Sequence, residues 1–377
     1  MLSVNPAPSG SSASSTNNDS NIAAFVSQNT IGILATVPGA PTSVVATSGN
    51  ASLAVTWVAP ASTGGSAITE YVVKYSSTGG LAGSWTRFFP SPRLPITATL
   101  CTVTGLINST SYVVKVIAKN AVGISLPSAN SAPVTPAAPR FLSAFWGLDD
   151  GMPQQMDGMP ITFSWLINPA SIDPADFNVI RSDGTVTVPA FATLRPANES
   201  NETQTILLTG DFGDAASGVR PVRVRLVGQL LGSPPGSKRS EAFSDLVSPP
   251  IRRLSAGPSI VDAWRIDPAL LTNDANACTV GSAFVRVVWS GGITDFPTGN
   301  EVGVAVTRAY RLTYLHRGKT VTVAPLEIGD LNDGDNMHDL SFPAIPARAK
   351  LLTITLPGRH VEDPNGDPNS FQVFRFR

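Results

Sequence analysis

Short stretches of alternating apolar and polar residues, separated by glycine and proline, run along most of the chain. In "SLAVTWV" the side chains of Leu53, Val55 and Trp57 share one side of an extended strand, because successive side chains of a strand point to opposite faces. The same period of two recurs at 112–116 and 161–165. Apolar residues at helical spacing are scarce. The pattern predicts an all-β chain of many short strands.

Turn-forming residues separate these runs and predict hairpins. Glycine and proline number 32 each, a density that suits short strands better than helices. Gly49–Asn50, Asp183–Gly184 and His316–Lys319 each lie between two apolar runs, as the loop of a hairpin does. The turns therefore add antiparallel pairing to the all-β prediction.

Changes in composition divide the 377 residues into an N-terminal segment and three units. Length alone predicts two to four domains, at about 100–200 residues per domain. The N-terminal residues are rich in serine, asparagine and proline, which is typical of a flexible arm. The proline-rich stretch "APVTPAAP" separates the first unit from the second. The predicted divisions are an arm and docking segment at 1–37 and domains at 38–139, 140–254 and 255–377.

The first unit resembles a fibronectin type III domain over about 100 residues. The resemblance rests on "PGAP", on Trp57, on "ITEYVVKYS" and on "VTGLINSTSYVVKVIAKNAVGISLPS", which occur in the order typical of that family. It implies a β-sandwich with Trp57 in the core and Tyr112 at a tyrosine corner. No "RGD" is present, so integrin-type recognition lacks support. The fold by itself does not give a function.

The rest of the chain resembles modules of bacterial surfaces. "FSWLINPASIDPADFNVIRSDGT" is similar to bacterial Ig-like modules of S-layer and surface proteins, and the resemblance covers about 141–254. The stretch 140–377 also resembles an uncharacterised family found beside such domains, through "LTGDFGD", "RVVWSGG" and "LNDGDNMHDL". That family implies no known activity. The predicted fold is a series of tandem Ig-like/fibronectin type III β-sandwiches behind a flexible N-terminal arm.

Composition and charge exclude several classes of function. Charged residues make up 14% of the chain and the net charge is -1, which favours neither nucleic-acid binding nor attraction to an anionic membrane. No run reaches the roughly 18 apolar residues of a spanning helix, so no membrane span is predicted. Cys101 and Cys278 fall in different predicted domains without zinc-type spacing. We expect small buried thiols there, rather than a disulfide or a zinc site.

One acidic loop, "GDLNDGDNMHD", is the main candidate for a metal site. An EF-hand loop needs glycine at its sixth position and glutamate at its twelfth, and this loop has neither. Calcium remains a candidate ligand of Asp330, Asn332, Asp333 and Asp335. The alternative is a polar turn whose side chains cap their own backbone. A second acidic loop at 362–369 would share the ion if the two loops lie side by side.

No catalytic constellation stands out, so the sequence predicts neither an enzyme nor an obligatory cofactor. The acidic residues cluster in hydrophilic turns, where carboxyl pKa values are expected to stay ordinary. His316, His338 and His360 are expected in or beside turns. The chain contains no GxSxG elbow, no P-loop and no GxGxxG motif.

Aromatic and apolar residues mark two candidate binding surfaces. Trp85 and Trp146 lie near predicted strand ends, where they would stack on glycans or, alternatively, pack in the core. The segment after the arm is apolar and is expected to dock on a partner or to pack as a strand on the next domain. Its docking residues are Ile22, Phe25, Val26, Ile31, Ile33 and Leu34.

The sequence therefore favours a non-enzymatic structural and adhesive surface protein that works within a homo- or hetero-oligomeric assembly. Its first residues have neither the basic nor the apolar region of a secretory signal. A virion component is accordingly the leading prediction, as a capsid decoration, fibre or tail-associated protein whose partners are other structural proteins. A secreted or cell-surface adhesin or S-layer-associated protein is the first alternative. A carbohydrate-binding module that recognises host or cell-surface glycans is the second.

Overall fold

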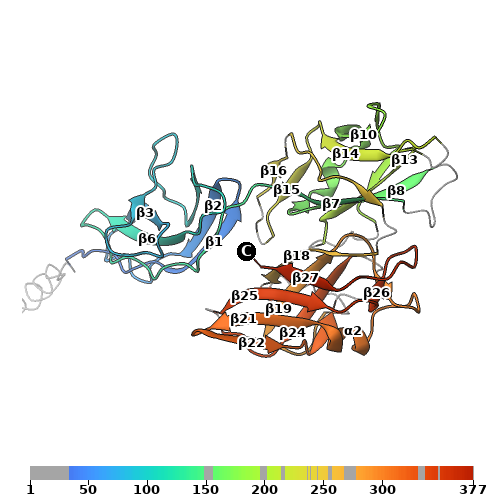
Figure 1. Ribbon diagram of the computed structural model, residues 1–377. Helices are drawn as coiled ribbons and strands as arrows, with labels where there is room; N and C mark the ends of the chain where they lie inside the picture. Colours follow the sequence, from blue (N-terminus) through green and yellow to red (C-terminus); the bar gives the residue numbers. More distant parts are fainter. Residues whose placement is uncertain are drawn as a thin grey trace, which may run out of the picture.

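In the computed structural model, strands are the main regular secondary structure of the chain (Figure 1). The described residues are 34–147, 156–195, 202–213, 217–235, 237, 239–243, 245–253, 257–266, 277–329, 336–346 and 349–376. Their helical segments are the short 3-10 turns Pro169–Ser171 and Pro174–Asp176 and the helix α2 (Val304–Ala309). The all-β prediction is confirmed.

The first sandwich consists of two three-stranded sheets. One has the order β1 (Thr42–Gly49), β2 (Ser52–Val58), β5 (Leu100–Thr104), and the other β4 (Thr86–Arg87), β3 (Ile68–Ser76), β6 (Val113–Asn120). Trp57 is buried between them with its ring 5.2 Å from that of Tyr71, edge to face. The Tyr112 hydroxyl accepts the N–H of Ile107 at 3.2 Å. Both roles that the resemblance implies, the core Trp57 and the corner Tyr112, are present.

A segment with three serines hydrogen-bonds to the outer edge of β6, although it does not form a regular strand. In each of three pairs the serine N–H donates to the carbonyl of a β6 residue, and the serine hydroxyl accepts the N–H of that same residue. The pairs are Ser125 with Ala118, Ser128 with Val116 and Ser131 with Val114. The serines are three residues apart in the sequence, whereas their partners in β6 are two residues apart. All the backbone groups along this edge are satisfied, as burial requires.

The second sandwich has a five-stranded sheet and two smaller ones. The large sheet has the order β12 (Phe191–Thr193), β13 (Thr205–Gly210), β8 (Asp157–Phe163), β7 (Phe141–Trp146), β17 (Arg252–Arg253). The smaller sheets have the orders β11 (Val186–Thr187), β10 (Phe177–Arg181), β14 (Pro221–Leu226) and β16 (Glu241–Ala242), β15 (Leu231–Ser233), β9 (Leu166–Ile167). Phe163, Trp165 and Phe243 stack in its core.

The third sandwich packs two four-stranded sheets face to face. They have the orders β18 (Ile260–Ile266), β19 (Ala283–Trp289), β24 (Met337–Phe342), β23 (Glu327–Gly329) and β22 (Lys319–Val323), β21 (Arg311–His316), β25 (Lys350–Leu356), β27 (Gln372–Arg375). A small sheet pairs β20 (Thr294–Asp295) with β26 (Val361–Glu362). The predicted hairpin turn at Arg317–Gly318 joins β21 to β22, and the one at Asp183–Gly184 joins β10 to β11.

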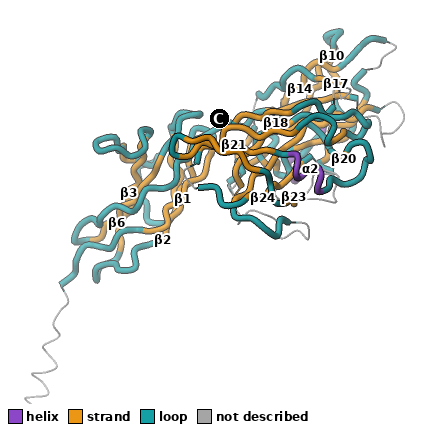
Figure 2. The backbone as a smooth tube through the Cα atoms, turned by 60° about the horizontal axis from the view of Figure 1, so that its bottom comes forward, coloured by secondary structure: helices purple, strands orange, loops and turns teal. Residues whose placement is uncertain are grey.

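The second and third sandwiches lie against each other, and the first extends from one end of them (Figures 1 and 2). Each sandwich has its own hydrophobic cluster. The residue boundaries predicted for the domains stay predictions. All residues of β19 and β24 are buried, although one face of a two-sheet sandwich normally meets solvent. The outer face of that sheet is therefore covered by something outside the third sandwich.

The tyrosine corner gives a first test of stability. Tyr112→Phe removes the acceptor of the Ile107 N–H, so we expect the first sandwich to lose about 1 kcal/mol of unfolding free energy. Urea denaturation of residues 34–139 measures this loss. Tyr75→Phe is the matched control, because the structure gives the Tyr75 hydroxyl no hydrogen-bond partner among the described residues, and this variant should unfold like the parent. Equal losses in the two variants would contradict the assignment.

Candidate functional site at the junction of the second and third sandwiches

Most of the sequence-predicted site residues lie outside the described part of the chain. These are Asp330, Asn332, Asp333 and Asp335 of the acidic loop and Ile22, Phe25, Val26, Ile31 and Ile33 of the docking segment. Leu34 is described, and 87% of it is exposed. Both the calcium site and the docking segment stay predictions.

The two tryptophans proposed for glycan stacking have neighbours on their rings. The ammonium of Lys115 lies 3.9 Å from the ring centroid of Trp85, and the guanidinium of Arg253 lies 5.7 Å from that of Trp146. Trp146 ends β7 and packs against the core of the second sandwich. Cation–π contacts of this kind occupy the ring faces on which a sugar would stack. The structure therefore shows each ring engaged within the protein, and the glycan role stays a prediction.

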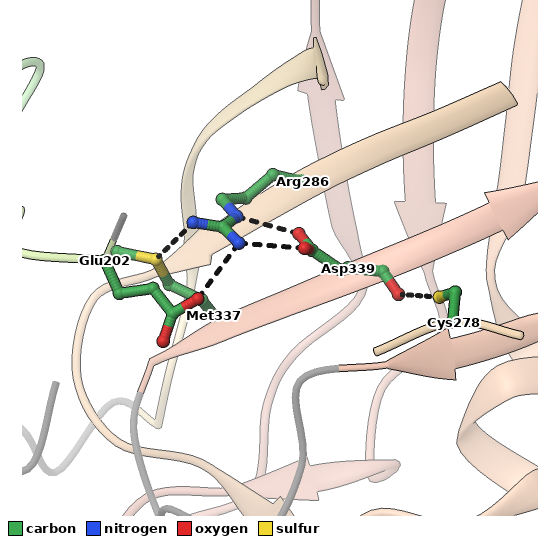
Figure 3. Close-up of polar contacts among 5 residues, drawn as sticks. All are labelled: Glu202, Cys278, Arg286, Met337 and Asp339. Atoms are coloured by element: carbon green, nitrogen blue, oxygen red, sulfur yellow. Dashed lines mark hydrogen bonds and ion pairs between the residues drawn. The ribbon is translucent and has the colours of Figure 1, made fainter. Parts of the chain in front are cut away.

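A buried ion pair lies in the third sandwich, on the outer face of the sheet that contains β19 and β24. Arg286 of β19 and Asp339 of β24 are directly opposite each other in the antiparallel register. The guanidinium donates from Nε at 2.7 Å and from Nη2 at 2.8 Å to the two carboxylate oxygens (Figure 3). Both side chains are almost fully buried. Strand pairing thus supplies the two-pronged geometry that suits arginine and carboxylate best.

The second sandwich supplies another carboxylate to the same arginine. Glu202, just before β13, lies 2.9 Å from Arg286 Nη2 through Oε1, and none of its side chain is exposed. Arg286 also donates to the sulfur of Met337 at 3.8 Å (Figure 3). A buried charge that loses its partner costs several kcal/mol. The outer face of β19 is therefore satisfied only when the second sandwich covers it.

Neutral hydrogen bonds continue the junction on either side of these charges. Asn336 donates through Nδ2 to the hydroxyl of Thr205 at 2.9 Å and to the carbonyl of Trp289 at 2.7 Å. Thr205 in turn bonds Thr162 at 3.1 Å. Further along, Asn365 Nδ2 donates to the carbonyl of Gly147 at 2.8 Å. Side chains of one sandwich thus form hydrogen bonds with groups of the other.

The thiol of Cys278 lies next to the ion pair but does not bond to its charged groups. Cys278 donates to the backbone carbonyl of Asp339 at 3.2 Å. Burial raises the pKa of the Cys278 thiol to about 12, so the sulfur stays protonated near neutral pH. Cys101 is likewise half-buried, and both cysteines are free. Both thiols are less buried than the small buried thiols that were expected.

His338 is the second residue of β24, two positions after the bend at Asn336, and is 2% exposed. The expectation of a place in or beside a turn did not include this burial. Trp289 Nε1 donates to the Tyr310 hydroxyl at 3.2 Å, and that hydroxyl lies 2.9 Å from His338 Nδ1. Because an indole nitrogen only donates, the tyrosine oxygen accepts from it, and the direction of the bond to Nδ1 depends on the histidine tautomer. Burial lowers the pKa of His338 to about 3, so the ring is neutral near neutral pH.

The prediction of ordinary pKa values in the acidic turns is wrong for Asp363. Its Oδ1 accepts the N–H groups of Asn365 and Asp367, both at 3.0 Å, which confirms the turn predicted at 362–369. Its Oδ2 is buried and has no hydrogen-bond partner among the described residues. Burial raises the pKa of this carboxyl to about 6. The loop caps its own backbone, and Asn365 anchors it to the second sandwich.

The joint between the first and second sandwiches is of a different kind. Arg239 Nη1 donates to the Thr102 hydroxyl at 3.1 Å, an exposed hydrogen bond between neutral and charged surface groups. The proline-rich stretch at 132–139, which was predicted as a linker, is largely bonded to the first sandwich: Val134 pairs with Tyr112, and the Ala137 N–H donates to the carbonyl of Gly49. Buried ion pairs are absent from the described residues of this joint. It therefore holds the first sandwich far less firmly than the junction holds the other two.

The residues of the junction escaped the sequence analysis, although one signal was present. Arg286 interrupts the apolar run "AFVRVVWS". A charge in such a run is rarely buried without a partner, which points to a carboxylate on a neighbouring strand. Within the described residues no group of three or more histidine, cysteine and acidic side chains is placed to hold a metal ion.

Comparison with known proteins assigns the first sandwich. The profile of the fibronectin type III domain family matches residues 39–134. These residues form a fibronectin type III domain. The family match covers about a quarter of the chain, and the identity of 140–377 stays a prediction. Fibronectin type III domains are typical of structural and adhesive proteins of the extracellular type, and they are typically non-catalytic.

Several solved structures are similar to a part of this chain. A titin fragment is 37% identical, over 28% of this chain and 34% of its own, with a TM-score of 0.25. A titin module from human cardiac muscle is 35% identical, over 26% and 88% respectively, with a TM-score of 0.21. A Fn3-like protein from Clostridium thermocellum is 25% identical, over 27% and 97%, with a TM-score of 0.22. The chain thus spans about a third of the titin fragment.

No helix in the described ranges is long and apolar enough to cross a membrane.

Removing the central arginine should weaken the junction strongly. Arg286→Ala leaves two buried carboxylates without their cation, and we expect a loss of about 3–5 kcal/mol in unfolding free energy. Chemical denaturation of the full chain measures it. Arg317→Ala, an exposed arginine in a hairpin turn, should change stability by no more than about 0.5 kcal/mol. An Arg286→Ala chain as stable as the parent would show that the pair adds nothing.

The burial of His338 predicts that the folded chain loses stability in acid. Its pKa is lower in the folded chain than the ordinary value of about 6.5, so the unfolded chain binds more protons between pH 6.5 and 3. Stability should therefore fall as pH decreases through that window, by roughly 3–5 kcal/mol from this residue.

The substitution His338→Asn tests this dependence, because an amide oxygen can still accept from Tyr310 but does not titrate. The pH dependence of the unfolding free energy should become shallower in His338→Asn and stay unchanged in His316→Asn. Identical pH profiles for all three chains would refute the assignment.

Proposed function

We propose that this protein is a non-enzymatic structural and adhesive component of a surface assembly. In this proposal the second and third sandwiches form one block, and the fibronectin type III domain is a jointed extension of it. The observation that carries the proposal is the contrast between the two joints. One has Arg286 buried between carboxylates of both sandwiches, and the other has an exposed hydrogen bond from Arg239.

Such an arrangement suits a spacer that presents a module at a distance. The block keeps its shape because its junction is directional and buried, while the contact of the fibronectin type III domain with the block is an exposed hydrogen bond. That domain also exposes large apolar side chains: Leu34 by 87%, Leu126 by 78% and Ile107 by 69%. Exposed apolar groups at its surface favour contact with other proteins of the assembly. The proposed docking segment leads into the same domain.

The more specific proposal is that the assembly is a virus particle, in which the chain is a capsid decoration, fibre or tail-associated protein. Its support is compositional. Only 14% of the residues are charged, so large parts of the surface can pack against other subunits without desolvating charges. A secreted or cell-surface adhesin, or an S-layer-associated protein, is the alternative that shares this support.

Mass spectrometry of purified material separates the two settings. We expect peptides of this chain in particles purified through a density gradient, at a constant ratio to the major structural protein across the particle peak. A soluble protein of the same lysate serves as the contamination control. Enrichment in the cell-envelope fraction, with absence from the particles, would overturn the virion assignment and favour the adhesin.

A further inference from the structure

The sheet of β1, β2 and β5 in the first sandwich carries no charge. None of the residues of these three strands is charged, so the outer face of the sheet has no ionic group. The other sheet of the same sandwich contains Glu70, Lys74, Arg87, Lys115 and Lys119. Because the solvated face of an antiparallel sheet is normally polar, the uncharged face departs from the usual pattern.

Large aliphatic side chains are exposed on this face. Val45, Thr56 and Leu100 are opposite one another in the strand register, so they form one row across the sheet. They point away from the core, because the residues on either side of Thr56 in β2 are buried in it. Val45 is 54% exposed, Leu100 is 61% exposed, and Val58, two positions after Thr56, is 55% exposed. Contiguous exposed apolar groups of this kind mark contact surfaces.

The second sandwich reaches the neighbouring row and leaves this one open. Arg239 donates to the hydroxyl of Thr102 at 3.1 Å, and Thr102 pairs with Ala54. Val45 and Leu100 keep their exposure beside this contact. A cover for their row therefore has to come from another part of the chain or from another molecule.

The chain enters the first sandwich at the end of the sheet where this row lies. The N–H of Thr36 donates to the carbonyl of Gly64 at 2.8 Å, in the loop that follows β2. Val58 is the last residue of β2 and pairs with Thr42, the first residue of β1. Leu34, where the described chain begins, is 87% exposed. The residues before Leu34 thus start at the same end of the sheet as the exposed row.

The sequence before Leu34 matches the face in polarity and in reach. No charged residue occurs between Asp19 and Glu70, so residues 22–33 and the strands β1 and β2 belong to one uncharged stretch. The apolar residues of this segment include Ile22, Phe25, Val26, Ile31 and Ile33. A segment of this length extends up to roughly 40 Å, whereas the outer strands of a three-stranded sheet lie about 10 Å apart.

We propose that residues 22–33 fold back and pack on this face of their own chain, where they cover Val45, Val58 and Leu100. The short connection to Leu34 gives the segment an effective concentration on the order of millimolar, so weak apolar contacts suffice. A charged partner is unsuited, because the face has no group to pair with its charges. The apolar segment is thereby assigned to packing on the next domain. The inference uses the first sandwich alone and does not depend on the virion assignment.

Chymotrypsin cleavage after Phe25 in the purified full chain tests the docking, with mass spectrometry to identify the fragment. We expect Thr56→Glu to accelerate this cleavage at least tenfold, because the docked segment would bury an unpaired carboxylate. Thr322→Glu is the matched control: it makes the same change on an exposed strand of the third sandwich, and the rate should stay that of the parent. Thermal unfolding verifies that both variants are folded. Equal rates in the parent and in Thr56→Glu would overturn the proposal.

Dilution separates docking within one chain from docking between copies. The cleavage rate after Phe25 should be the same at every protein concentration, because a tethered segment does not depend on a second molecule. A rate that rises on dilution would overturn docking within the chain and identify the face of a second copy as the place where the segment binds.

Methyl NMR observes the face itself. We expect the methyl signals of Val45, Val58 and Leu100 to shift when residues 1–33 are deleted from the chain. The methyl signals of Leu315, an exposed leucine of the third sandwich, should stay in place. Unchanged signals of all three face residues would overturn the proposal, whatever the cleavage experiment shows.

Discussion

The requirement that a buried guanidinium be paired governs the relation between the second and third sandwiches. Arg286 lies on a strand whose two faces are both buried, so its charge cannot reach water. Asp339 satisfies part of the guanidinium from within the same sheet. Glu202 satisfies another part from the second sandwich. Any docking that covered β19 without Glu202 in place would bury charge at a cost of several kcal/mol. The ion pair thus selects one arrangement of the two sandwiches among many.

The ion pair selects one arrangement of the two sandwiches, but this does not mean that it holds them together strongly. Desolvation of the three charged groups offsets much of their attraction, so an apolar interface of the same area would hold as firmly. What the polar junction adds is direction, because hydrogen bonds such as the one from Asn336 to Thr205 fail when the sandwiches slide. The anchor from Asn365 to Gly147 acts in the same sense at the other end. A block with one defined shape follows from these constraints.

Much of the fold could be predicted from the sequence, because period-two alternation and turn chemistry are local signals. Alternation placed Leu53, Val55 and Trp57 on one face of a strand, and the resemblance to the fibronectin type III family supplied the core role of Trp57 and the corner role of Tyr112. The junction was missed because burial of the outer face of β19 depends on a distant part of the chain. Alternation alone predicts that Arg286 faces solvent. The burial of His338 has another cause: it lies opposite Val287 and against Trp289 and Tyr310, in the core of the third sandwich itself.

The loop at 362–369 shows how far local rules extend. Asp-Pro and Asn-Gly steps specify a turn, and Asp363 caps that turn through Oδ1 as such steps predict. The raised pKa of Asp363 follows from the burial of its own side chain, although the tip of the turn at 364–366 is exposed. A sequence that encodes a turn therefore leaves its electrostatics open until the neighbouring domain is placed.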